Sequence, residues 1–151
     1  MVLLDARDAE DSAQWHPEGP GIATFANVPY DEFVADEEDA FAHVPETDSI
    51  YVLCARGKTS QYVTGVLRRR GRNAINVEGG MMAWAAHHRV IPLGLSDDVA
   101  VYQIVRPAKG CLSYVVCSGG EALVVDATRY PAVYQEFARR NGARIVAVAD
   151  T

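Results

Sequence analysis

The sequence predicts an α/β fold in which a mainly parallel sheet is flanked by helices. It also predicts a C-terminal, partial α/β segment with antiparallel hairpins. Over residues 1–90, short β-branched runs alternate with longer amphipathic runs, which is typical of a parallel sheet. After residue 98, short apolar runs are separated only by turn residues, which indicates hairpins. A length of 151 residues allows one domain, or one small domain and part of another.

The first part of the chain contains the expected parallel strands and their helices. Each expected strand is a short apolar run, and each expected helix has apolar residues on one side. Thr59 or Ser60 is expected to cap the second helix, and Gly71 to end it. The expected strands cover residues 2–5, 23–28, 50–53 and 74–77, and the expected helices cover residues 30–44, 61–70 and 81–88.

The character of the sequence changes near residues 90–97, where we expect a domain boundary. The predicted domains are residues 1–92 and residues 96–151. The second segment is too small to build a good core alone. Its expected strands cover residues 99–105, 111–117, 122–125 and 145–149, and its expected helix covers residues 131–140.

Composition excludes several classes of function. The net charge of −6 and the lack of a basic face argue against a nucleic-acid partner. No apolar run approaches the ~20 residues of a membrane-spanning helix, and the N-terminus does not resemble a signal peptide. Three cysteines are too few for a disulfide framework. We therefore expect a cytoplasmic protein with no membrane partner.

Cys54 is the main candidate for catalysis. It follows the expected strand 50–53 and faces the start of the next helix, where unpaired N–H groups favour an anion. Arg56 and Lys58 add two cations nearby. These surroundings can lower a thiol pKa from about 8.5 toward roughly 3.5–7.5. The alternative is an inert, buried structural thiol.

The remaining cysteines and histidines give weaker signals. Cys111 and Cys117 are six residues apart in an expected strand and should share one face, as core residues or, in the alternative, as a resolving thiol for Cys54. His16, His87 and His88 lack ligand spacing and are interpreted as surface residues. No metal ligands are predicted.

Four segments occur in an order that resembles a single-domain rhodanese, a sulfurtransferase, over roughly residues 1–90. They are Leu3-Leu4-Asp5-Ala6-Arg7, Asn27-Val28-Pro29, the Cys54 loop, and Val77-Glu78-Gly79-Gly80-Met81-Met82-Ala83-Trp84. The resemblance implies that Cys54 carries sulfur as a persulfide and that Asp5 and Arg7 form a structural pair. It implies that Glu78 and Trp84 support the loop and that no cofactor is needed. The substrate-binding residues that it implies are Ala55, Arg56, Gly57, Lys58, Thr59 and Ser60.

Phosphatases and arsenate reductases share this fold, and their signature is Cys, five residues, then Arg. The sixth residue after Cys54 is Ser60. A phosphate would therefore lack its bidentate guanidinium partner, and we do not expect phosphatase activity.

Residues 96–151 resemble the opening of a metallo-β-lactamase fold, and fusions of the two folds handle persulfides. The resemblance rests on residues 109–114, 121–126, Thr128-Arg129 and 145–151. In that fold a His-x-His-x-Asp-His metal motif follows the strand that ends here at Thr151. We therefore expect residues 96–151 to be an N-terminal fragment of such a domain.

The predicted function is sulfur transfer from thiosulfate or a similar anionic donor, through Cys54, to a thiol or cyanide acceptor. Arg56 and Lys58 favour an anionic donor. The alternative is a non-catalytic or sulfur-carrying part of a split or truncated rhodanese and metallo-β-lactamase enzyme. In that case a metal-bearing metallo-β-lactamase chain is the expected partner.

Overall fold

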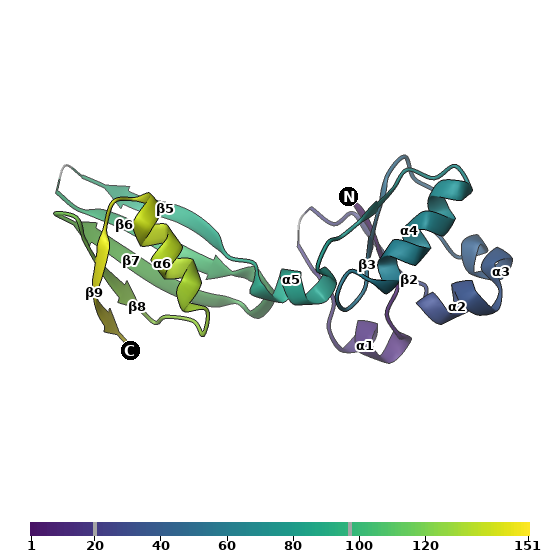
Figure 1. Ribbon diagram of the computed structural model, residues 1–151, viewed down its shortest axis with the longest axis horizontal. Coiled ribbons are helices and arrows are strands. Elements are labelled where there is room, and N and C mark those ends of the chain that lie inside the picture. The colour runs from purple at the N-terminus through teal and green to yellow at the C-terminus, as the bar shows by residue number, and fades with distance from the viewer. Residues whose placement is uncertain (20, 97) are drawn as a thin grey trace. The chain divides into compact units, whose positions relative to one another are not determined.

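A four-stranded parallel sheet forms the first part of the chain in the computed structural model (Figure 1). The structure describes residues 1–19, 21–96 and 98–151, without the side chain of Leu95. The strands are β1 (Val2–Asp5), β2 (Thr24–Asn27), β3 (Ile50–Leu53) and β4 (Ala74–Asn76), in the order β2-β1-β3-β4. The predicted α/β class, with a parallel sheet flanked by helices, is confirmed.

Helices cover this sheet because its strands are apolar on both faces. Along β1, Leu4 is buried in a cluster with Val52, whereas Leu3 is buried in a second cluster with Leu53. None of the helices in the described part of the chain is long and apolar enough to cross a membrane. The helices are α1 (Ala9–Gln14), α2 (Tyr30–Ala35), α3 (Glu37–Ala42), α4 (Thr59–Arg69) and α5 (Gly80–Ala86).

The prediction of one helix over residues 30–44 is wrong, because two helices meet at Asp36. Asp36 has an extended backbone (φ −148°, ψ 95°), so the helical hydrogen bonds cannot continue through it. Its side chain accepts hydrogen bonds from the N–H groups of Glu38 and Asp39, and thereby caps α3. The apolar residues keep a helical period across this break, which explains the single prediction. Helix α1 was not predicted; it is six residues long and buries only Ser12.

The second part of the chain forms a five-stranded sheet with a helix. Its elements are β5 (Arg89–Leu95), β6 (Ala100–Arg106), the 3-10 turn η1 (Pro107–Lys109), β7 (Cys111–Ser118), β8 (Glu121–Val125), α6 (Pro131–Arg140) and β9 (Arg144–Ala149). The strands are antiparallel in sequence order, except that β9 runs parallel to β8 after α6. Ile104, Val115 and Val124 from the sheet form a core with Tyr134 and Phe137 of α6.

The chain divides into two compact units, Met1–Trp84 and Ala85–Thr151. This division falls earlier than the expected boundary near residues 90–97. Those residues were expected to connect the domains, but most of them lie in β5, which pairs with β6. The pairing is irregular between Pro92 and Gly94, two residue types that are rare inside strands. Asp97, which also falls in the expected boundary, lies outside the described residues.

Candidate active site around Cys54

Cys54 lies at the carboxyl end of β3, in the loop that leads to α4. Its residue surface is 3% exposed, so the thiol is almost completely enclosed. The carboxyl ends of β1 and β4 lie on either side of β3, because both strands run parallel to it. In open α/β sheets this edge is where ligands bind.

Two donors point at the Cys54 sulfur. The Gly57 N–H lies 3.1 Å from Sγ, and the Ser60 hydroxyl lies 3.2 Å from it. Ser60 is completely buried. Thr59 or Ser60 was expected to cap α4, but no side-chain capping hydrogen bond is present at Lys58, the residue before the helix. The Ser60 hydroxyl instead donates to the sulfur.

Burial raises the pKa of the Cys54 thiol, but hydrogen bonds outweigh this effect and lower the pKa to about 7. The donors are the side chains of Ser60 and Thr59 and the backbone N–H groups of Ser60 and Arg56. The shortest contact, from the Gly57 N–H, belongs to the same set of converging donors. The lowering was expected, but its main causes are hydrogen bonds rather than the charges of Arg56 and Lys58. The thiolate is therefore populated at neutral pH.

The outer part of the loop is open to solvent. Ala55, Arg56, Lys58 and Thr59 are exposed, whereas Gly57 is buried. Arg56 and Lys58 are therefore exposed on the loop, and the donors that contact the sulfur are neutral. Such an arrangement can attract an anion without pairing permanently with the thiolate.

A glycine pair at the start of α5 packs directly against the Cys54 loop. Gly80 has φ +53°, and a Cβ atom on it would overlap the Cys54 carbonyl oxygen. A Cβ atom on Gly57 (φ +78°) would lie 2.6 Å from the Gly79 nitrogen. The N–H groups of Met81 and Met82 donate to the carbonyls of Cys54 and Ala55 at 2.9 and 3.1 Å. Gly79 and Gly80 were not predicted as site residues, although two adjacent glycines before a helix are a visible signal.

The family model of the rhodanese-like domain matches residues 1–87. The chain belongs to the rhodanese-like family. The match covers the parallel sheet, the Cys54 loop and α5. No curated protein matches the chain.

Solved rhodanese-like structures are similar to this chain. A rhodanese-like domain protein from Staphylococcus aureus is 30% identical, with a TM-score of 0.44, over 54% of this chain and 72% of that one. A rhodanese-related protein from Thermoplasma volcanium is 25% identical, with a TM-score of 0.43, over 55% and 74%. The reduced CoADR-RHD protein of Bacillus anthracis is 28% identical, with a TM-score of 0.43, over 53% of this chain but only 13% of its own.

Asp5 and Arg7 form a buried ion pair in this rhodanese-like domain. Arg7 Nη2 lies 2.6 Å from Asp5 Oδ2, and Arg7 Nε donates to the same carboxylate. Arg7 Nη2 also donates to the Trp15 carbonyl, and the Asn27 side chain donates to the carbonyls of Asp5 and Arg7. The pair therefore joins the end of β1 to α1 and β2.

Glu78 and Trp84 occupy different environments. Trp84 packs against the cluster of Leu3, Leu53 and Met81, and Leu53 directly precedes Cys54. Glu78 is exposed. The close contacts with the Cys54 loop come from Gly79, Gly80 and the N–H groups of Met81 and Met82.

Cys111 and Cys117 lie in the second unit, outside the rhodanese-like match, and both are partly exposed on β7. Cys117 packs against the core of that unit, and burial raises the pKa of its thiol. Within residues 1–19, 21–96 and 98–151, no group of three or more His, Cys, Asp or Glu residues is placed to hold a metal ion.

Proposed function

We propose that the protein is a sulfurtransferase that carries sulfane sulfur on Cys54 as a persulfide. The observation that carries the proposal is the enclosed Cys54 thiol, which meets the Gly57 N–H and the Ser60 hydroxyl and has a pKa of about 7. A thiolate that is populated at neutral pH is the nucleophile that this chemistry requires. Membership of the rhodanese-like family supports the same function.

With thiosulfate as donor, the Cys54 thiolate attacks the outer sulfur. A new sulfur–sulfur bond forms, the bond in the donor breaks, and sulfite leaves with the electron pair. The negative charge then resides on the outer sulfur of the persulfide. Cyanide attacks that sulfur in the second step, which yields thiocyanate and regenerates the Cys54 thiolate.

The loop suits an anionic donor because of how its charges are arranged. Arg56 and Lys58 are exposed on the Cys54 loop, and no acidic residue lies between Cys54 and Ser60. Neutral donors, the Gly57 N–H and the Ser60 hydroxyl, lie where the sulfur binds. Exposed cations on the loop raise the local concentration of anions. Thiosulfate is therefore the proposed donor, and a thiol or cyanide is the proposed acceptor.

Thiocyanate formation from thiosulfate and cyanide tests this function. Wild type should turn over, Cys54→Ser should be inactive, and Cys111→Ser should match wild type. Arg56→Gln should mainly raise the KM for thiosulfate, because the positive charge of Arg56 attracts the anionic donor. Activity that persists in Cys54→Ser would contradict the proposal.

The second candidate is a sulfur-carrying domain that serves a metal-bearing metallo-β-lactamase chain or region. Its support is the second unit, whose sequence resembles the opening of that fold and which has a sheet and a helix of its own. Complete persulfide formation on Cys54, with slow release to cyanide and to small thiols, would favour this candidate. Rapid turnover with either acceptor would favour the independent sulfurtransferase.

A further inference from the structure

We propose that the second unit contains a binding site for a small oxyanion, separate from Cys54. The site is an open cavity of about 540 Å³. We name it the basic pocket, and the residues in its lining that carry the argument are Arg106, Lys109, Cys111, Asp126, Thr128 and Arg129. None of these residues belongs to the segment that matches the rhodanese-like domain.

The first observation is the buried guanidinium of Arg106, which forms no ion pair with any residue that the structure describes. The residue is only 6% exposed. Its Nε donates to the Ala85 carbonyl at 2.6 Å, its Nη2 donates to the Tyr130 hydroxyl at 3.3 Å, and its charge lies 4.8 Å from the centre of the Tyr130 ring. All of these partners are neutral, and no carboxylate pairs with Arg106 in the part of the chain that the structure describes.

A buried charge without a counter-ion is unfavourable, so buried charges in proteins are usually paired. The ring and the two hydrogen bonds offset part of this cost for Arg106. Its Nη1 makes no hydrogen bond to a described residue, and it is not among the fully enclosed polar atoms that lack a partner, so a solute in the pocket can reach it. An oxyanion in the pocket would supply both the missing acceptor and the missing charge.

The second observation is the charge of the pocket lining. Arg106, Lys109 and Arg129 contribute three cations, against the single carboxylate of Asp126. That carboxylate already accepts hydrogen bonds from the N–H and the hydroxyl of Thr151. The pocket is therefore locally positive in a chain whose net charge is −6.

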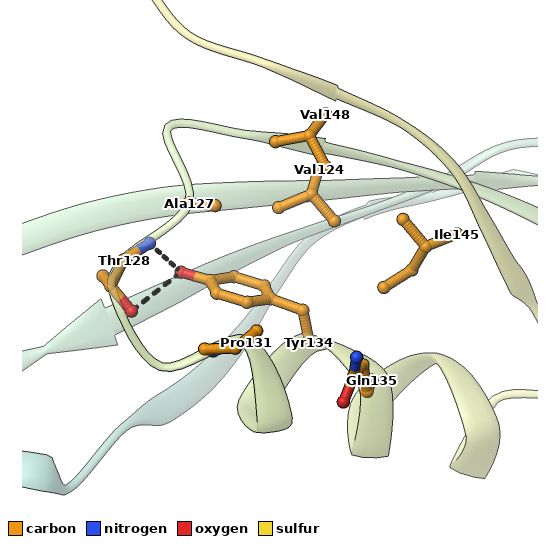
Figure 2. Close-up of a pocket in the computed structure, with 8 residues that line it drawn as sticks. All are labelled: Val124, Ala127, Thr128, Pro131, Tyr134, Gln135, Ile145 and Val148. Atoms are coloured by element: carbon orange, nitrogen blue, oxygen red, sulfur yellow. Dashed lines mark hydrogen bonds between the residues drawn. The ribbon is translucent and has the colours of Figure 1, made fainter.

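Hydrogen bonds of Tyr134 and His88 with Thr128 hold the loop that carries Arg129 in place. Figure 2 shows the Tyr134 hydroxyl against Thr128, where it accepts from the Thr128 N–H at 2.8 Å and donates to the Thr128 hydroxyl at 3.2 Å. His88 Nε2 lies 3.2 Å from the same Thr128 hydroxyl. An anion would thus meet a loop that is already ordered, which reduces the entropic cost of binding. By contrast, the neighbouring cavity in Figure 2, which also includes Val124, Ile145 and Val148, has no charged residue in its lining.

These groups define the chemical class of the ligand. A guanidinium donates to carboxylate and phosphate oxygens in a fixed, planar geometry. With two further cations at the same cavity, the pocket suits a small dianion that bears carboxylate or phosphate groups. This inference does not depend on sulfur transfer at Cys54.

Calorimetric titration of the full chain at low ionic strength tests the proposal, with inorganic phosphate and with succinate as probes. Wild type should bind at least one of them. Lys109→Gln and Arg129→Gln should each bind about tenfold more weakly, because each removes one charge-assisted contact. Arg139→Gln, which removes an exposed arginine of α6, should bind like wild type. Lys109 and Arg129 are exposed, so these substitutions should leave the fold intact.

The alkylation rate of Cys111 distinguishes binding in this pocket from binding at the Cys54 loop. Cys111 contributes to the pocket lining, so a bound anion should slow its alkylation by neutral iodoacetamide, as measured on the Cys111 peptide by mass spectrometry. Cys54→Ser and Arg56→Gln should leave the affinity unchanged. Binding of phosphate alone or of succinate alone would support the proposal and identify the anion class. The proposal would be overturned if neither probe binds, or if Arg56→Gln abolishes binding while Arg129→Gln does not.

Discussion

At the scale of residues, the chemistry of Cys54 depends on hydrogen bonds more than on charge. Burial alone would keep the thiol protonated, yet its pKa falls to about 7 because hydroxyl and N–H donors converge on the sulfur. The sequence predicted the position of Cys54 after a strand and the direction of its pKa shift. It did not predict that hydrogen bonds would be the main cause of the lowered pKa. Charged residues are visible in a sequence, whereas the direction of a backbone N–H depends on the fold.

Ser60→Ala should raise the pKa of Cys54 by about one pH unit or more. The substitution removes a donor to the thiolate, and a hydrogen bond to a charged group contributes roughly 1.5–3 kcal/mol. Because the thiolate loses stabilisation, the midpoint of the alkylation rate against pH moves upward, and the rate below pH 7 falls. Ser118→Ala, which changes an exposed serine of the second unit, is the control. An unchanged midpoint in Ser60→Ala would mean that its hydroxyl does not stabilise the thiolate.

Gly80→Ala should abolish persulfide formation or unfold the first unit, because a Cβ atom there would overlap the Cys54 carbonyl. Gly71→Ala is a matched control: Gly71 also has positive φ (+82°), but its Cβ position has open space around it. Gly71→Ala should lower the free energy of unfolding only by the backbone strain, about 1–2 kcal/mol, and the variant should retain activity. Circular dichroism and persulfide yield are measured on both variants. Equal effects of the two substitutions would show that the contact between α5 and the loop is unimportant.

At the scale of elements, the strands were easier to predict than the connections between them. The runs at residues 2–5 and 50–53 are apolar on both faces, and the structure gives these strands the same bounds. The helix expected over residues 30–44 breaks at Asp36, because a side-chain cap on α3 replaces continued backbone hydrogen bonds. Strand β5 was missed because Pro92 and Gly94, which are rare inside strands, weaken its sequence pattern.

The ion pair of Asp5 and Arg7 gives a prediction at this scale, because it joins β1 to its neighbours. Asp5→Asn should lower the free energy of unfolding of the first unit by about 3–5 kcal/mol, since it leaves a largely buried guanidinium unpaired. Urea unfolding followed by circular dichroism measures the loss. Asp8→Asn, at an exposed position before α1, should change stability little. A loss for Asp5→Asn no larger than that of the control would contradict the structural role of the pair.

At the scale of the whole molecule, the two units have separate hydrophobic cores. Among the side chains that the structure describes, the clusters around Leu4 and Leu3 contain only residues of Met1–Trp84, and the cluster around Phe137 contains only residues of Ala85–Thr151. Amphipathic patterns predicted two segments. They did not predict where the segments divide, because that depends on which sheet β5 joins.

Phe137→Ala should therefore destabilise the second unit by about 3–5 kcal/mol and leave the Cys54 site unchanged. Phe137 is 8% exposed and packs against Tyr102 in the core of that unit. Hydrogen exchange should increase in β6 to β9, while exchange in β1 to β4 and the alkylation midpoint of Cys54 stay constant. Loss of protection in β1 to β4 would show that the first unit depends on the second.

The most direct test of the central claim is the intact mass of the protein after incubation with thiosulfate and removal of the excess donor. We expect one added sulfur atom on wild type, complete removal of that sulfur by a reductant, and no adduct on Cys54→Ser. An adduct that survives in Cys54→Ser, or wild type that gains no reducible sulfur, would contradict the assignment of Cys54 as the sulfur carrier.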